Sequence, residues 1–447
     1  MRSIVLPGCL LALLLPFVAG AEPAVSITTG PILGRLDAHG IGVWGRTDRP
    51  GTFRVRYGAA ENKLDQLSDP VKTSLDHDNT GWVHITKLKA NTKYWYELTD
   101  AEGNRIAAGG SFRTLPDAAD FKDATHNPRG LFNFRFEFAC GNNQDEMHGS
   151  GPALPAFKTM LDNLKDKVNF AILNGDWLYE DRREFSAADW LKANGLTRKD
   201  EPRIVRLAPT ICGVWENYKI YLSRGKNLAA WHRNMPSFFT FDDHEILNDV
   251  WGAGTPGRRN RRAVFRDIGV RAWYDYLGWA NPTPFKQAAL FGKTTLKKGS
   301  DVLEDPEADF SKLDLDQAAT LLVHWGTPTA GVNDNKLDEQ AGDPNASVYG
   351  IDKIVDKTHL KITPAARADS TQSYSIGRRN YFKMTVSNCD FFVCDTRTHR
   401  QMHDTKDAAK KGVSMLGVDQ KKWLMDGMKA SQADFFFVVS SVNFMVP

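Results

Sequence analysis

The sequence predicts an α/β domain preceded by a small all-β sandwich. Residues 22–115 hold short runs of β-branched and aromatic residues separated by turn clusters, which is typical of a sandwich. From residue 120 onwards, apolar runs of strand length alternate with runs of helical periodicity, which favours a partly parallel sheet. We therefore expect a sandwich over 22–115, an α/β domain over 120–447, and a short linker between them.

The strands expected in the sandwich share a mixture of β-branched and aromatic residues. They are Ile41–Trp44, Thr52–Tyr57, Trp82–Thr86 and Tyr94–Leu98. The segment Leu88–Tyr96 also resembles the corner-turn strand of fibronectin type III domains. Acidic, basic and metal-ligating residues do not gather in this part of the sequence, so we place no chemistry there.

The α/β domain is predicted to begin with a strand, a helix and a second strand. Phenylalanines alternate at 132, 134, 136 and 138 and lead to Cys140, which predicts a strand. Phe157, Met160, Leu161 and Leu164 lie on one face of a helix, and the apolar run Val168–Leu173 predicts the next strand. This order indicates a βαβ unit with parallel strands.

Further elements follow the same logic. Phe238–Phe241 and Phe435–Val439 predict strands, Tyr381–Val386 and Cys389–Cys394 predict a hairpin, and Arg261–Leu277 predicts a helix. Residues 283–370 are polar and interrupted by Gly and Pro. We expect them to form an insertion on the domain surface that walls a cleft.

Composition excludes several classes of protein. The 447 residues are 42% hydrophobic and 25% charged, which excludes a disordered or collagenous chain. With 57 basic and 54 acidic residues the net charge is only +3, which argues against a nucleic-acid-binding protein. The four cysteines beyond the N-terminal segment could form two disulfides or stay as buried thiols: Cys140, Cys212, Cys389 and Cys394.

The first 21 residues are predicted to be a signal peptide. Arg2 precedes an apolar run from Ile4 to Val18, and Ala19-Gly20-Ala21 supplies the small residues of a cleavage site. The alternative is an uncleaved anchor helix, but the run is short for a bilayer span and contains two prolines. We therefore expect a secreted or periplasmic protein with no membrane anchor after cleavage.

Residues that could bind metal or phosphate stand where several core strands end. Cys140, Asp176, Asp243 and Asp395 each follow or close an apolar run. In open α/β sheets, ligands bind outside the carboxyl ends of the strands. These side chains are therefore predicted to lie near one another although they are distant in sequence.

Asp176 follows Asn174-Gly175, so the backbone can turn sharply at the strand end. Its carboxylate could bridge two cations, and Tyr179 could bind the same metal as a phenolate. The alternative is a common Gly-Asp turn beside a packed tyrosine.

The densest acid–base cluster is Asp242-Asp243-His244-Glu245. Asp243 could bind a cation, Asn248 could add an amide oxygen, and His244 could donate a proton to a leaving oxygen or contact a phosphate. The alternative is an aspartate that caps a following helix.

Two other features have an open interpretation. A Cys140 thiolate would be a soft ligand for iron or zinc, but a buried free cysteine is the alternative. The basic cluster Arg258–Arg262 could attract anionic substrates or could simply be a solvated face.

Four segments together resemble the alkaline phosphatase D (PhoD-like) metallophosphatases in order and spacing. They are Ala139-Cys140, Leu173–Glu180, Phe241–Glu245 with Asn248, and Cys394–Arg397. The resemblance implies an α/β metallophosphoesterase-type sandwich core and a phosphomonoesterase or phosphodiesterase activity. It also implies Fe3+ bound by Cys140, Asp176 and Tyr179, with Ca2+ completing the site. Asp176 would bridge the two metals.

In the same resemblance, the region of Asp243, His244 and Asn248 would supply the second metal and the phosphate contact. The resemblance gives no definite role, beyond a contact with phosphate or a place at the rim of the site, to Asp242, Asp395 and Arg397. His399 stands where the family usually has an aromatic residue. The family also has a Gly-Asp-x-His segment beyond the strand that corresponds to Phe435–Val439, and this sequence has none there. We therefore expect a fragment that, as written, binds iron weakly and hydrolyses little.

The expected function is thus a secreted hydrolase of phosphate esters, with small esters or phosphodiesters of lipids or wall polymers as substrates. Two alternatives remain open. One is a related hydrolase that uses Zn2+ or Mn2+, and the other is a non-catalytic extracellular binding protein.

Overall fold

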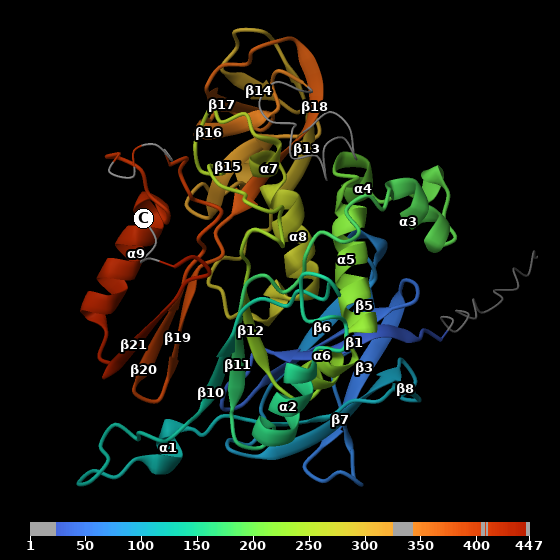
Figure 1. Cartoon of the computed structure of the whole chain (residues 1–447), viewed down its shortest axis with the longest axis vertical. Coiled ribbons are helices and arrows are strands. Elements are labelled where there is room, and N and C mark those ends of the chain that lie inside the picture. The colour runs from blue at the N-terminus through green and yellow to red at the C-terminus, as the bar shows by residue number, and fades with distance from the viewer. Residues whose placement is uncertain (1–23, 325–342, 404–406, 408–409, 444–447) are drawn as a thin grey trace, which may run out of the picture.

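A computed structural model describes residues 24–324, 343–403, 407 and 410–443 (Figure 1). The predicted signal peptide over 1–21 and the last residues, 444–447, lie outside the described residues. Within the described part of the chain, no helix is both long and apolar enough to cross a membrane.

The N-terminal part is built from two antiparallel sheets, as the sequence predicts. One sheet contains β1 (Ile27–Gly34), β2 (Ile41–Thr47) and β6 (Thr80–Ile85). The other contains β3 (Gly51–Gly58), β4 (Gln66–Leu67), β5 (Val71–Thr73), β7 (Lys93–Asp100), β8 (Arg105–Ala107) and β9 (Ser111–Arg113). Val43, Val55 and Leu98 are fully buried in the core that the two sheets share.

The predicted βαβ unit is present. Strands β10 (Phe136–Ala139), β11 (Phe170–Asn174) and β12 (Ser237–Thr240) form a parallel sheet, and α2 (Pro155–Leu164) connects the first two. The first strand is shorter than the alternating phenylalanines suggest. Phe132 and Phe134 pack against the core without pairing into the sheet, and Phe138 is half exposed.

A second sheet packs against the first (Figure 1). It consists of β19 (Phe382–Val386), β20 (Cys389–Val393) and β21 (Phe435–Val439), and α9 (Gly417–Ala430) lies between the last two in sequence. The predicted hairpin and the predicted last strand are therefore confirmed. Phe136 joins the sheets, because its ring centroid lies 5.0 Å from that of Phe391 and 5.2 Å from that of Phe437.

Seven further α-helices belong to the described part of the chain. They are α1 (Ala118–Phe121) in the linker, α3 (Ala187–Ala193), α4 (Arg203–Leu207), α5 (Ile211–Arg224), α6 (Lys226–His232), α7 (Arg261–Val264) and α8 (Arg266–Tyr276). The single helix expected over 261–277 is thus two helices, with Phe265 as the C-cap of the first and the N-cap of the second.

The insertion between α8 and β19 is a folded unit that the sequence analysis did not foresee. It forms a closed barrel of β13 (Leu290–Leu296), β14 (Val302–Glu304), β15 (Ala318–Val323), β16 (Ser347–Ile354), β17 (His359–Thr363) and β18 (Ser370–Arg378). Leu303, Leu321 and Leu360 are fully buried in its own core. The barrel strands carry Thr, Ser and Lys among their apolar residues, so the sequence looks polar and weakly periodic there.

All four described cysteines are free thiols. Cys212, Cys389 and Cys394 are buried, whereas Cys140 is exposed. The expectation of buried thiols therefore holds for three of them, and the alternative of two disulfides among the four is wrong.

Candidate metal and phosphate site

The three parallel strands end at one edge of the sheet, and their following residues lie together there. Ala139 is paired with Leu173, and Asn174 with Thr240. The loops beyond them are joined by backbone hydrogen bonds, since Asn142 N donates to the Asp176 carbonyl over 2.8 Å. The structure thus brings the residues after β10, β11 and β12 to one place.

Gly175 allows the loops after β11 and β12 to approach closely. Its φ is +77°, and a Cβ at this position would lie 2.8 Å from the Cβ of Asp242. Asp176 also has a positive φ, +52°. The backbone therefore favours glycine at 175 and turns the Asp176 carboxylate towards the acidic cluster.

Asp176, Asp243 and His244 form a group with the spacing of metal ligands. One ligand atom from each lies within 4.8 Å of the other two. Asp176 Oδ1 is buried and has no hydrogen-bond partner among the described residues. Because a buried carboxylate oxygen is costly to leave unpaired, this atom fits a cation.

Crowded carboxylates give this place an excess of negative charge. Burial raises the pKa of Asp176 to about 6, and the charges of Asp242 and Asp243 add to the effect. Burial would also raise the pKa of Asp243, but the charge of Arg397 and a 2.6 Å hydrogen bond from Asp249 N lower it overall. A cation would relieve the repulsion among these acids.

His244 is oriented by Glu180. Its Nδ1 lies 2.7 Å from Glu180 Oε2. Burial would lower the pKa of His244, but this hydrogen bond and the charges of Glu180, Asp243 and Asp176 raise it to about 9. These interactions favour the imidazolium form, with Nδ1 engaged by Glu180 and no partner for Nε2 among the described residues.

Tyr179 and Cys140 lie beside this group. The Tyr179 ring centroid is 4.0 Å from that of His244, and a Cβ at Gly141 would lie 3.9 Å from the Tyr179 hydroxyl. Burial, Asp176 and neighbouring acids raise the pKa of Tyr179, with Cys140 among the contributing charges. Cys140 is not one of the three residues within 4.8 Å of one another.

Asn248 is held near His244 by the same carboxylate. Its backbone N donates to Glu180 Oε1, and its Nδ2 lies 3.4 Å from Asp249 Oδ2. Asn248 and His244 thus share Glu180 as a partner, and the predicted amide ligand faces Asp249 through its Nδ2.

Arg397 holds the two neighbouring aspartates. Its guanidinium donates to Asp242 Oδ1 and, over 3.2 Å, to Asp243 Oδ1, and also to the Val250 carbonyl over 3.1 Å. Asp395 instead shapes its own turn, because its Oδ1 accepts from Thr398 N over 2.9 Å. Arg397 therefore balances the charge of the acids.

The capping alternative for Asp242 and Asp243 is wrong. No helix begins in the described chain directly after β12. The Asp243 carbonyl accepts from Ile246 N and Leu247 N within a turn, and α7 begins only at Arg261. The cluster thus serves the site and not a helix end.

The basic cluster Arg258–Arg262 is not simply a solvated face. Arg258 and Arg259 are half-buried.

Glu245 belongs to the predicted acid–base cluster, but the sequence assigns it no role. Its fully buried carboxylate accepts from Trp177 N over 2.6 Å, Asp242 N over 2.8 Å and Asp176 N over 3.2 Å. Burial, then the charge of Asp176, raises its pKa to about 8. Glu245 therefore fixes both acidic loops. Both Glu245 and Glu180 stand in segments that the sequence already marks as chemically dense, and that position was the available signal.

A column of buried aromatic rings connects the site to the sandwich. Trp177 stacks on Tyr218 at 5.7 Å, Tyr218 on Tyr276 at 4.8 Å, and Tyr276 lies 5.3 Å from Trp44 of β2. The far end is fixed by buried Asp78, which accepts a 2.6 Å hydrogen bond from Tyr276 Oη.

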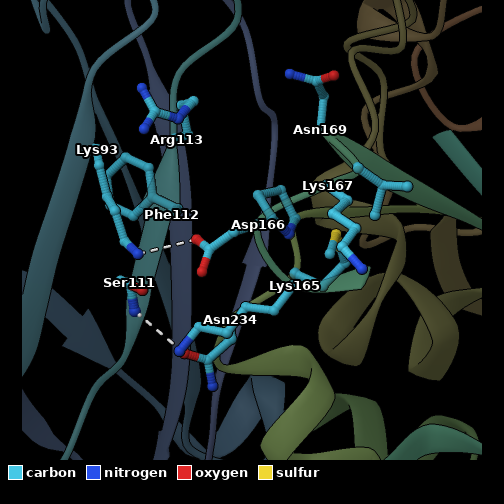
Figure 2. A pocket seen from close by; sticks show the side chains of 12 residues that line it. Lys93, Ser111, Phe112, Arg113, Lys165, Asp166, Lys167, Asn169 and Asn234 are labelled. Carbon is cyan, nitrogen blue, oxygen red and sulfur yellow. Dashed lines mark hydrogen bonds and ion pairs between the residues drawn. The ribbon is translucent and has the colours of Figure 1, made fainter. Parts of the chain in front are cut away.

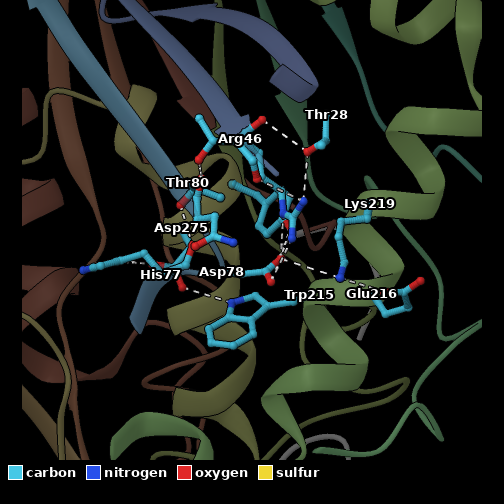
Figure 3. Close-up of polar contacts among 12 residues, drawn as sticks. Thr28, Arg46, His77, Asp78, Thr80, Trp215, Glu216, Lys219 and Asp275 are labelled. Atoms are coloured by element: carbon cyan, nitrogen blue, oxygen red, sulfur yellow. Dashed lines mark hydrogen bonds and ion pairs between the residues drawn. The ribbon is translucent and has the colours of Figure 1, made fainter. Parts of the chain in front are cut away.

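Asp78 also forms an ion pair with the guanidinium of Arg46 (Figure 3). Lys219 of α5 lies nearby, with its Nζ 3.9 Å from Asp78 Oδ2. Trp177, the residue next to Asp176, is thus connected through the stacked rings to buried groups of both the sandwich and the α/β domain.

The chain matches a known protein family. The model of the family described as PhoD-like phosphatase matches residues 135–298 and 358–446. The chain belongs to the PhoD-like phosphatase family. The family model leaves residues 1–134 and 299–357 of this PhoD-like chain unmatched, and the second stretch runs from the end of β13 to the start of β17 in the barrel.

A solved structure described as the structure of PhoD has the same overall fold. It matches with a TM-score of 0.54 at 16% identity, over 94% of this chain and 63% of that one. This PhoD-like chain therefore spans less than two thirds of the length of that structure.

A sensor domain of the anti-sigma factor RsgI4 in Pseudobacteroides cellulosolvens also matches. Its TM-score is 0.18 at 17% identity, over 22% of this chain and 100% of that one. A search of curated proteins finds no match.

Proposed function

We propose that this chain is a metal-dependent phosphoesterase that hydrolyses phosphate esters with water. The observation that carries the proposal is the group of Asp176, Asp243 and His244, in which a buried carboxylate oxygen lacks a partner among the described residues. Membership of the PhoD-like phosphatase family supports the same reaction class.

The donor types among these residues suit two kinds of cation. Cys140, Asp176 and Tyr179 would hold Fe3+, and Asp176, Asp243 and Asn248 would hold Ca2+, because thiolate and phenolate suit the first and carboxylate and amide oxygens the second. Zn2+ or Mn2+ is the alternative for the same carboxylates and imidazole. Bound cations polarise phosphoryl oxygens and lower the pKa of water.

The remaining roles in the reaction would fall to side chains of the protein. His244 is held protonated by Glu180, so its free Nε2 would donate a proton to the leaving oxygen or contact the phosphate. Arg397 would keep Asp243 ionised, since its charge lowers the pKa of that carboxyl. Glu245 would hold the loops at Asp176 and Asp242 in register.

Substrates would be phosphate monoesters or diesters, with lipid or wall-polymer phosphodiesters included. The predicted signal peptide over 1–21 would direct the protein out of the cytoplasm, and sequencing the N-terminus of the exported protein would test this.

The test of the reaction is hydrolysis by protein expressed from the whole reading frame in which this sequence lies. We expect it to hydrolyse p-nitrophenyl phosphate or bis-p-nitrophenyl phosphate after metal loading. Asp243→Asn should lower kcat/KM by roughly a hundredfold or more, whereas Asp352→Asn on the exposed face of the barrel should not. Hydrolysis that survives Asp243→Asn would contradict the proposal, and metal content would separate Fe3+ with Ca2+ from Zn2+ or Mn2+.

A further inference from the structure

A recess lies between the sandwich and the α/β domain, away from the metal site (Figure 2). It is a small hollow of about 60 Å³ that opens to solvent. The α/β residues that line it precede β11 and β12, whereas the site follows these strands. The recess is therefore at the opposite edge of the sheet. We call it the interdomain recess.

The interdomain recess is strongly positive. Lys93 and Arg113 line it from the sandwich, and Lys165 and Lys167 from the loop before β11. Asp166 is the one acidic residue in its lining. These five side chains carry a net charge of +3, as much as the whole 447-residue chain.

The one carboxylate does not neutralise these cations. Asp166 Oδ1 lies 2.9 Å from Lys93 Nζ, and Figure 2 shows the two side chains pointing towards each other across the recess. That hydrogen bond, followed by the charges of Lys93, Lys165 and Arg113, lowers the pKa of Asp166 although burial opposes it. Several cations from both domains thus lie around a single carboxylate.

Two of the cations are left for another partner. Within the described chain, neither Lys165 nor Lys167 forms an ion pair, and Lys167 is exposed. Arg113 donates to the Asn91 carbonyl over 2.8 Å, which fixes its guanidinium without neutralising it. Like charges gathered on facing walls repel, and an anion between them would remove that repulsion.

We propose that the interdomain recess binds a phosphate-type oxyanion, and that linked phosphates bind more tightly than a single phosphate. The cations come from two domains and are spread over the recess, so an anion with several charges can contact more of them than a compact one. This binding is separate from hydrolysis, because no residue of the recess belongs to the metal site.

The test is calorimetric titration of the protein with inorganic phosphate and with tripolyphosphate at low salt, after removal of metals with a chelator. We expect saturable binding of tripolyphosphate that weakens several-fold when salt rises from about 50 to 200 mM. Lys165→Gln/Lys167→Gln should weaken it by roughly tenfold. The matched control is Lys297→Gln/Lys298→Gln, an exposed pair on the barrel that removes the same charge, and it should bind like the wild type.

Equal affinity of the two double variants would overturn the proposal, as would the absence of saturable binding for both anions. Tighter binding of tripolyphosphate than of phosphate supports linked phosphates as the ligand, whereas equal binding would overturn that part. Because metals are absent from the titration, failure of the phosphoesterase assay would leave this result unchanged.

Discussion

Trp177 N donates a 2.6 Å hydrogen bond to Glu245 Oε1, and this contact joins the loop after β11 to the loop after β12. The other carboxylate oxygen accepts from Asp242 N. One buried side chain therefore sets the relative position of the two acidic loops.

Glu245→Gln should weaken cation binding as well as stability. In the variant, the side-chain NH2 group would face a backbone N–H that donates to a carboxylate oxygen in the wild type. About 2 kcal/mol of unfolding free energy should therefore be lost. Urea unfolding and equilibrium dialysis with Mn2+ measure the two effects. Leu360→Ala in the barrel core is the control, because it destabilises by a similar amount or more far from the site. Equal cation affinities in both variants would contradict the role of Glu245.

Glu180→Gln should lower the pKa of His244 in metal-free protein. The hydrogen bond and charge of Glu180 raise this pKa to about 9 against the effect of burial, so we expect a fall of about one unit or more. An NMR titration of the imidazole carbons measures it. Glu184→Gln, in the same segment, serves as a control and should leave the His244 titration in place.

Asp78→Ala should destabilise the sandwich and the α/β domain together. The variant leaves Arg46 buried without its carboxylate and removes the acceptor for Tyr276 Oη, which should cost about 3–5 kcal/mol. Tyr276→Phe, which keeps the stacked ring, should cost only about 1–2 kcal/mol. Separate urea transitions for the two domains in the wild type would contradict the coupling.

Glu137→Gln should stabilise the protein at alkaline pH. Burial alone raises the pKa of Glu137 to about 7, and its Oε2 has no partner among the described residues. An acid whose pKa is raised in the folded state binds more protons folded than unfolded, so stability falls as pH rises from about 4.5 to 7. The glutamine variant should gain roughly 1–2 kcal/mol at pH 8 and little at pH 5, after allowance for partial exposure of the glutamate. A gain of the same size at both values of pH, measured by urea unfolding, would argue against this cause.

The sheet elements near the site were predictable because their apolar runs are continuous. Phe435–Val439 was predicted with the bounds that the structure has, and β11 and β12 shifted by one or two residues. Strand ends in a parallel sheet share an edge, so Asp176 and Asp243 could be placed together from the order of the strands alone.

The barrel and the buried acids were not predictable in the same way. Strands such as β13 and β18 carry Thr, Ser and Lys among their apolar residues, so their sequence resembles an irregular insertion. Glu245 acts through three backbone N–H groups from two loops. Its role depends on tertiary contacts that no local pattern records.

The most direct test of the central claim is the cation content of the wild type and of Asp176→Asn, measured by elemental analysis after equilibrium dialysis. Asp176 has a buried carboxylate oxygen without a partner among the described residues. It also belongs to the group of possible metal ligands with Asp243 and His244. The account predicts that the variant loses at least one equivalent of bound cation that the wild type retains. Equal cation content in the two proteins, both folded, would contradict it.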